Sequence, residues 1–403
     1  MTAADLATRF FLAAAVILLV CRVVSALAAR AGQPPVVGEM IAGVLLGPSL
    51  LGAVAPRLEA DLFPKALLAV IYVAGQLGLA ALMFQAGREL RGYLRPGLGR
   101  TAGTISGLGV TVPLAAGVAL AFAARGHVAI FLPGVSTLVT AAFVGVTLAI
   151  TAFPMLARII LERGLSGTWF GSLALACGGI DDMAAWLLLA AVRPLASRYL
   201  ARPGLSAQTL LLVTMTLVLL AAWFTSTIGL YAVFGAFSIG LVMPEPDPAV
   251  AGPDTAGPAP AALEKTVGPV MDGISKVLVP MFFTYSGLNT RFALLTSPRL
   301  LAFSAAAIVV AVLSKGGACW LGARLAGEPG PVAARIGALM NARGLMQLIA
   351  LNVGLQAHLA SPELFTSLVL VALVTTIMTA PVLSWLDRRQ AEPVSPWAAP
   401  IPG

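Results

Sequence analysis

The sequence predicts an all-α, polytopic membrane protein, and three observations lead to this fold class. Of the 403 residues, 59% are hydrophobic and only 10% are charged. The mean hydropathy of +0.94 is unlike that of soluble globular domains. Apolar runs long enough to cross a bilayer as helices follow one another along nearly the whole chain. This composition excludes a soluble enzyme, and the net charge of +8 needs no nucleic-acid partner because arginines in short loops orient membrane proteins.

Twelve apolar runs are expected to be membrane helices within one transporter domain, residues 1–389. The first run continues into further membrane helices and lacks a small-residue cleavage site, so we expect an uncleaved helix. The Pro-, Ala- and Gly-rich stretch 244–265 is expected to be a flexible loop, and 390–403 a Pro-rich tail. The twelve runs lie at roughly 7–29, 35–52, 65–86, 101–123, 131–160, 167–192, 207–228, 230–243, 267–288, 300–322, 332–356 and 362–385.

Two adjacent carboxylates, Asp181 and Asp182, stand in the middle of the apolar run 169–192. A charge at bilayer depth costs a few kcal/mol or more, so it marks an ion pathway by default. Neighbouring helical residues point about 100° apart, so one carboxylate can bind a counter-charge while the other faces water. This layout suits a proton or cation carrier. The alternative is a chance polar pair that faces a protein interior.

Two of the predicted helices carry chain breakers at corresponding places in the two halves. Thr151 and Pro154 interrupt the run 131–160, and Asn341, Arg343 and Gly344 interrupt the run 332–356. Proline removes a backbone hydrogen bond and frees carbonyls, although a plain proline kink is the alternative for the first break. A pair of interrupted helices is typical of inverted-repeat transporters, whose ion sites lie at such breaks.

Two further charged residues lie in apolar runs. Lys315 stands within 301–321, and we expect it inside the protein, paired with a carboxylate. Snorkelling to the interface is the alternative. Glu39 lies near the end of its run, and an interfacial and a functional carboxylate are equally compatible with that position. The cysteines show no metal-ligand spacing, so neither a disulfide, a zinc site nor another cofactor is expected.

Motifs at 33–39, 46–49, 84–90, 151–158, 228–237, 280–288 and 341–346 follow one another along roughly 7–387. Together, in this order, they resemble the monovalent cation/proton antiporter family. The resemblance is to its second branch, which includes bacterial Kef-type and plant cation/proton exchangers. This resemblance implies an inverted-repeat fold with two crossing broken helices. It also implies a homodimer, with a dimerisation scaffold at about 7–90 and 207–290 and a transport core at about 100–192 and 300–387.

The resemblance further implies a secondary transporter of the cell membrane that exchanges Na⁺ or K⁺ for H⁺ by alternating access, and not an enzyme. Asp182 would carry the cation and the proton in turn, Asp181 would pair with Lys315, and Thr151 would contribute to the cation site. At the breaks, Arg343 would hold core acids or loop carbonyls. The other residues implied at the breaks are structural: Pro154, Asn341 and Gly344.

The chain departs from the family pattern in one respect. Members commonly have thirteen helices, but the stretch between Asp182 and the motif at 228 leaves no space for the linker helix between the repeats. Loop arginines place the N-terminus outside, so twelve crossings would leave Arg388 and Arg389 outside too, against the positive-inside rule. We therefore expect either an irregular connection at 183–205 that preserves the helix crossing, or a lost crossing. The alternative function is a transport-defective paralogue or an ion-responsive sensor.

Overall fold

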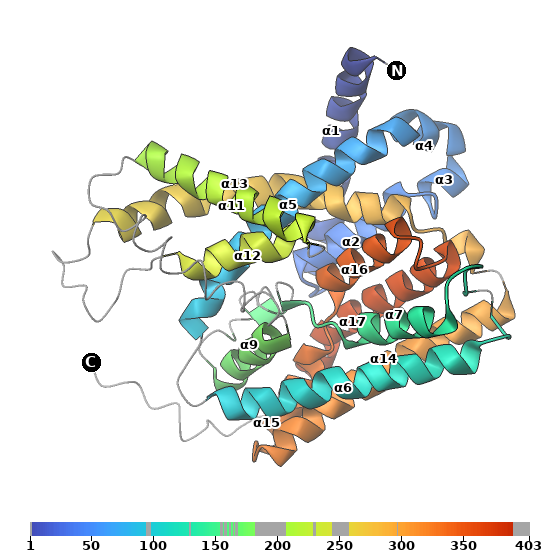
Figure 1. Cartoon of the computed structure of the whole chain (residues 1–403), viewed down its shortest axis with the longest axis vertical. Helices are drawn as coiled ribbons and strands as arrows, with labels where there is room; N and C mark the ends of the chain where they lie inside the picture. Colours follow the sequence, from blue (N-terminus) through green and yellow to red (C-terminus); the bar gives the residue numbers. More distant parts are fainter. Residues whose placement is uncertain are drawn as a thin grey trace.

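The computed structural model describes residues 2–93, 98–128, 130–153, 168–181, 207–228, 231–243, 258–295 and 297–389, with 156, 159, 160, 163 and 165. This part of the chain is helical and contains no strand (Figure 1). Nine of its helical spans are long and apolar enough to cross a membrane, and three shorter apolar helices accompany them. An all-α membrane fold was therefore predicted correctly.

The helices of the first half are α1 (Ala3–Arg30), α2 (Pro35–Leu46), α3 (Leu51–Val54), α4 (Pro56–Leu62), α5 (Lys65–Tyr93), α6 (Leu98–Ala124), α7 (Thr137–Ala149) and α9 (Trp169–Asp181). The second half contains α11 (Ala207–Thr227), α12 (Ala232–Val242), α13 (Pro258–Leu288), the 3-10 turn η1 (Phe292–Leu294), α14 (Pro298–Leu325), α15 (Gly330–Met340), α16 (Gly344–Gln356) and α17 (Pro362–Arg389).

Both predicted interruptions are present. The helix expected at 131–160 is α7, which ends at Ala149 because Ile150 turns to φ −58° and ψ 134°, outside the helical region. The helix expected at 332–356 is divided into α15 and α16 by residues 341–343. One expectation was wrong: α13 begins at Pro258, inside the predicted loop 244–265. Proline is tolerated in the first turn of a helix, and the alanines after it favour helix.

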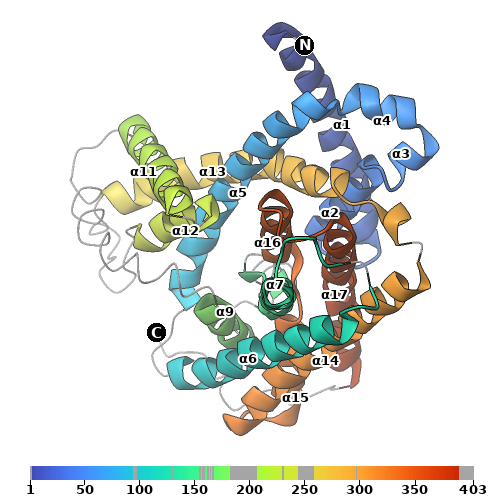
Figure 2. The same cartoon turned by 45° about the vertical axis from the view of Figure 1, so that its right-hand side comes forward.

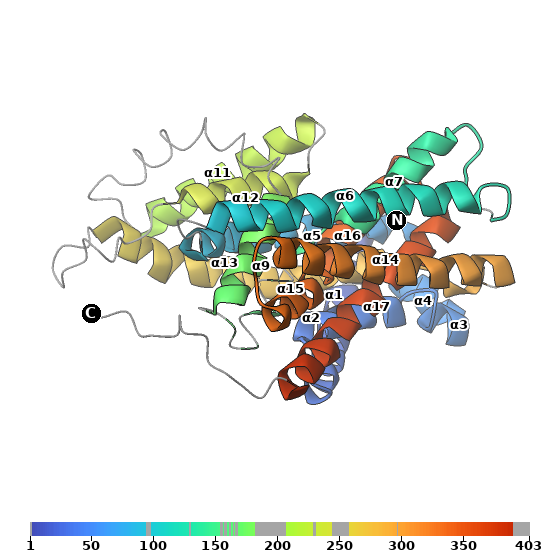
Figure 3. The ribbon, with the colours of Figure 1, turned by 90° about the horizontal axis from the view of Figure 1, so that it is seen from below.

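The helices pack in two groups (Figure 2). In the first group, α5 packs against α12 and α13, α2 packs against α1 and α13, and α11 packs against α12. In the second group, α14 packs against α6, α15 and α17, while α6 also contacts α7 and α9. Figure 3 shows α6 lying lengthwise beside α14. The second group contains both breaks and α9, so it holds Thr151, Lys315 and the helix that ends at Asp181, all of which belong to the predicted ion site.

Two close helix crossings reveal the internal repeat. A Cβ built on Gly43 of α2 would lie 2.2 Å from the carbonyl oxygen of Phe283 on α13. A Cβ built on Gly240 of α12 would lie 2.0 Å from the carbonyl oxygen of Phe84 on α5. Only glycine lets the backbones approach so closely. Helix α2 of the first half therefore packs closely against α13 of the second half, and α12 of the second half packs in the same way against α5 of the first half. This reciprocal arrangement is that of an inverted repeat.

Contacts between distant segments define one end of the molecule, which we call the arginine end. A Cβ on Gly322, near the end of α14, would lie 2.9 Å from Cα of Ile105, near the start of α6. Three side-chain contacts join the other segments here: Trp169 with Glu328 at 2.9 Å, Arg335 with Asp387 at 3.0 Å, and Arg163 with Ser384 at 2.8 Å. The arginines gathered at this end are Arg100, Arg163, Arg324, Arg335, Arg388 and Arg389.

The two ends of the described chain lie at opposite ends of the molecule. Arg9 of α1 donates a hydrogen bond to the carbonyl of Asp61 on α4, at 2.7 Å. Because α5 then runs to the arginine end, α4 lies at the end opposite to it. Arg388 and Arg389 share the arginine end with Arg163, as the positive-inside rule requires. The second half is therefore not inverted. The connection 183–205 lies outside the described residues, so its form stays a prediction.

Candidate ion-exchange site at the crossing of the broken helices

The two helix breaks contact each other in the second group of helices. The backbone N–H of Ala152, which follows α7, donates to the carbonyl of Ala342, which follows α15, at 3.4 Å. Thr151 is buried beside this contact. The polar backbone of both breaks is thus placed inside the protein, the position in which irregular backbone is tolerated at membrane depth. The predicted crossing of two interrupted helices is present.

The end of α7 presents carbonyls that have no helical donor, because the last four carbonyls of any helix lack one. Arg343 donates from Nη1 to the Leu148 carbonyl, and Lys315 donates from Nζ to the Ala149 carbonyl. The C-terminal end of a helix carries a partial negative charge. Two cationic side chains from the second half of the sequence therefore stabilise the end of a half-helix from the first half.

Arg343 connects the second break, in which it lies, with α7 and α14. Its side chain is fully buried, and Nη2 donates to the Ala311 carbonyl of α14 at 2.7 Å. The resemblance implied that Arg343 holds either core acids or loop carbonyls. Its described contacts include two backbone carbonyls, those of Leu148 and Ala311. The planar guanidinium has donors that point in different directions, so it can reach carbonyls on two helices at once. The arginine thus connects the first break to α14 from within the second break.

The first residue of α16 is held by a side chain that sequence reasoning did not identify. The Gly344 N–H donates to Oγ1 of Thr376 on α17 at 3.0 Å, which satisfies one of the donors that a helix start leaves free. Gly344 has φ of +30°, a backbone angle that favours glycine. Asn341, at the end of α15, is buried and donates to Sδ of Met378 at 3.9 Å. The second break is therefore supported by α17.

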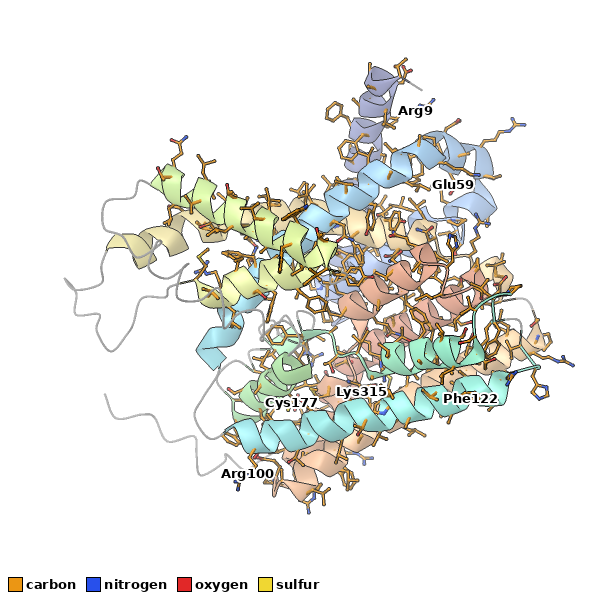
Figure 4. All side chains as sticks on the ribbon, viewed as in Figure 1. Arg9, Glu59, Arg100, Phe122, Cys177 and Lys315 are labelled. Atoms are coloured by element: carbon orange, nitrogen blue, oxygen red, sulfur yellow. The ribbon has the colours of Figure 1, made fainter. Side chains whose placement is uncertain are left out.

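Lys315 is fully buried, which fits the expected interior position and not snorkelling. In Figure 4 Lys315 lies between Cys177 of α9 and Phe122 of α6. Besides the Ala149 carbonyl, Nζ contacts the Gly109 carbonyl of α6 at 3.1 Å. The lysine therefore lies between the end of α7 and the middle of α6.

The last turn of α9 reaches the first break. A Cβ built on Gly178 would lie 3.3 Å from Cδ2 of Phe153, which follows the break directly. Asp181 is the last described residue of α9, but its side chain lies outside the described part, as do Asp182 and Pro154 entirely. The acidic pair thus follows a helix turn that packs against the crossing. Its predicted contacts with Lys315 stay a prediction.

Glu39 lies on α2 in the first group of helices and is half-buried. It is therefore not among the residues that the structure brings to the crossing. Among the described residues, no three His, Cys, Asp or Glu side chains cluster as a metal site would require. The three cysteines are buried and unbridged.

Comparison with known proteins now decides the family. The family model described as "Sodium/hydrogen exchanger, transmembrane" matches residues 15–202 and 192–386. The chain belongs to this family. It is accordingly a multi-pass membrane protein of the cation/proton antiporter type and not an enzyme.

Curated relatives agree with this membership. The chain is 35% identical to the Na⁺/H⁺ antiporter NhaS4 of Synechocystis sp., over 91% of this chain and 94% of that one. It is 32% identical to cation/H⁺ antiporter 18 of Arabidopsis thaliana, covering 91% of this chain but 48% of the relative. It is 30% identical to K⁺/H⁺ antiporter 1 of Saccharomyces cerevisiae, covering 93% and 46%. The chain thus spans about half the length of the plant and yeast relatives.

A solved structure supports the fold. The sodium proton antiporter MjNhaP1 from Methanocaldococcus jannaschii, determined at pH 8, superposes with a TM-score of 0.64 over 94% of this antiporter and 97% of that chain. The sequences are 14% identical, so this likeness concerns the fold alone.

Proposed function

We propose that this antiporter exchanges a monovalent cation, Na⁺ or K⁺, for H⁺, and that Asp181 and Asp182 form the exchange site. The observation that carries the proposal is the contact between the two breaks, against which the last turn of α9 packs. Lys315 and Arg343 bring positive charge to the same place. A site with carboxylates and buried cations at the end of a half-helix can bind a cation and a proton in competition.

Each group has a distinct role in this proposal. Asp182 binds the cation when ionised and the proton when neutral, so the two ligands compete for one carboxylate. Asp181 pairs with Lys315 in the state without a bound cation, and Lys315 itself exchanges a proton during the cycle. Thr151 supplies a hydroxyl oxygen beside the crossing. The carbonyls at the end of α7 are already held by Arg343 and Lys315, so the half-helix end keeps its geometry as the ligand changes.

Alternating access requires one body to move against another. We propose that the second group of helices is the transport core and that the first group is the scaffold. The scaffold helices α1 and α11 expose large apolar side chains, among them Phe11, Leu19, Trp223 and Phe224. In the proposed homodimer, part of this apolar surface faces the second subunit and the rest faces lipid. The arginine end faces the cytoplasm.

Ion flux in proteoliposomes tests this function. The purified chain is reconstituted with a pH-sensitive dye inside an acidified lumen, and Na⁺, K⁺, Li⁺ or choline is added outside in turn. Alkalinisation of the lumen with Na⁺ or K⁺, but not with choline, is the expected result, and the half-saturating concentrations give the selectivity. The relatives' names contain both Na⁺ and K⁺, so both ions are included. Equal responses to all four salts would contradict cation/proton exchange.

The proposed pair between Asp181 and Lys315 makes a separate prediction about stability. Removing one partner of a buried pair strands the other and costs roughly 3–5 kcal/mol. Lys315→Gln should therefore lower the melting temperature in detergent more in the native sequence than in an Asp181→Asn background. The measurement is a thermal double-mutant cycle. Losses that simply add would show that the pair is absent.

A further inference from the structure

The middle of α6 carries a proline at a position that bears on Lys315. Pro113 lies inside α6 and is buried. Because proline has no N–H, it cannot donate to the carbonyl four residues earlier. In α6 that carbonyl belongs to Gly109, which is buried on the same face of the helix.

The freed carbonyl is the one that Lys315 contacts. Nζ of Lys315 lies 3.1 Å from the Gly109 oxygen, a normal hydrogen-bond distance for an ammonium donor. Gly109 also lets α14 come close, since a Cβ at this position would lie 2.7 Å from Sγ of Cys319. Glycine and proline thus act together: one admits the helix that carries the lysine, and the other leaves a carbonyl for it.

We propose that Pro113 is a positioning residue for Lys315. By withholding an amide proton it leaves the Gly109 carbonyl free to hold the lysine ammonium between α6 and the end of α7. An unsatisfied carbonyl at membrane depth is costly, so the lysine and the carbonyl stabilise each other. In the exchange cycle, the Gly109 and Ala149 carbonyls still accept from Lys315 when Asp181 leaves the lysine to bind the cation. That last step rests on the proposed function.

Within the described part of the chain, the helices packed around Lys315 carry the following charged and titratable groups. Cys177 of α9 is buried against α6. Arg343 donates to the Ala311 carbonyl on α14, Cys319 follows on α14 itself, and Asp181 ends α9, with Asp182 next in the sequence. Within α6 the charged residue is Arg100 at its start, and α7 has none. The charged residues of α15 and α17 lie away from the breaks: Arg335, Glu363, Asp387, Arg388 and Arg389.

A thermal cycle between Pro113→Ala and Lys315→Met tests the assignment without relying on transport. Lys315→Met leaves the Gly109 carbonyl without its ammonium donor, and Pro113→Ala supplies an N–H in its place. The Tm gain from Pro113→Ala should therefore be larger, by about 2 °C, in the Lys315→Met background than in the native sequence. Pro280→Ala is the matched control. Pro280 is also a buried proline within a membrane helix, but the carbonyl that it frees belongs to the exposed Lys276.

The pH profile of exchange gives the second readout. Losing part of the carbonyl's hold on the ammonium lets Lys315 release its proton at lower pH. Pro113→Ala should therefore move the alkaline limb of the flux profile toward acid by about one pH unit, and Pro280→Ala should not move it. A larger Tm gain in the Lys315→Met background together with this pH shift supports both the assignment of Pro113 and the role of Lys315 in exchange.

The two readouts separate two failures. The Tm changes from Pro113→Ala and Lys315→Met could be coupled while the alkaline limb of the flux profile stays in place. That result would support Pro113 as the positioning residue and contradict the proposed role of Lys315 in exchange. Additive melting, with the same gain from Pro113→Ala in both backgrounds, overturns the assignment of Pro113 whatever the flux shows.

Discussion

Asp182→Asn should abolish cation-coupled proton movement and leave the protein folded. Asparagine keeps nearly the shape of aspartate but cannot ionise, so it can neither neutralise a bound cation nor release a proton. The residue lies outside the described part of the chain, but it follows the turn of α9 that packs against the first break. The expected result is the loss of Na⁺- or K⁺-dependent lumen alkalinisation, with an unchanged elution profile and melting temperature.

The matched control is Asp272→Asn. Asp272 lies on α13 and pairs with Lys276 on the exposed surface of that helix, where ion pairs contribute little. This variant should keep full exchange. Cation-dependent flux that persists in Asp182→Asn would show that another group carries the ion, and the assignment of Asp182 would then be wrong.

Arg343→Met should cost the most stability of any single substitution at the crossing. The change removes the donors that hold the Leu148 carbonyl at the end of α7 and the Ala311 carbonyl of α14. Losing hydrogen bonds from a charged donor, with a buried carbonyl left unsatisfied, costs about 2–4 kcal/mol. The thermal midpoint in detergent should fall accordingly. Exchange should fall with it, because the end of α7 loses its alignment with the second break.

Two variants sharpen this prediction. Arg343→Lys keeps the charge but offers one nitrogen in place of a planar fork, so it should recover only part of the stability. Arg335→Met removes an arginine whose partner, Asp387, is half-exposed, and it should cost less than about 1 kcal/mol. A midpoint for Arg343→Met equal to that of Arg335→Met would mean that the carbonyl contacts do not hold the crossing together.

Much of this antiporter could be predicted from residue patterns alone. Apolar runs indicated the membrane helices because hydrophobic length is a property of consecutive residues. The breaks after α7 and α15 were predicted because Pro154, Asn341 and Gly344 oppose regular helix where they stand in the chain. The acidic pair and Lys315 attracted attention because a charge within an apolar run is conspicuous in one dimension.

The orientation of the second half of the chain could not be derived from residue patterns in the same way. Counting runs gave twelve crossings and a conflict at Arg388, because the count left no crossing between Asp182 and the motif at 228. The contacts at the arginine end resolve the orientation by joining segments far apart in sequence, such as Trp169 with Glu328 and Arg335 with Asp387. No local pattern encodes such contacts.

The acceptors of the buried cations are the clearest case of what only the tertiary structure decided. Lys315 bonds to carbonyls of Gly109 and Ala149, and Arg343 to those of Leu148 and Ala311. Every residue has a carbonyl, so the sequence does not mark which ones are used. A proline such as Pro113 or a helix end only makes a carbonyl free. Which cation reaches it depends on how α6, α7 and α14 pack, and that is a property of the folded chain.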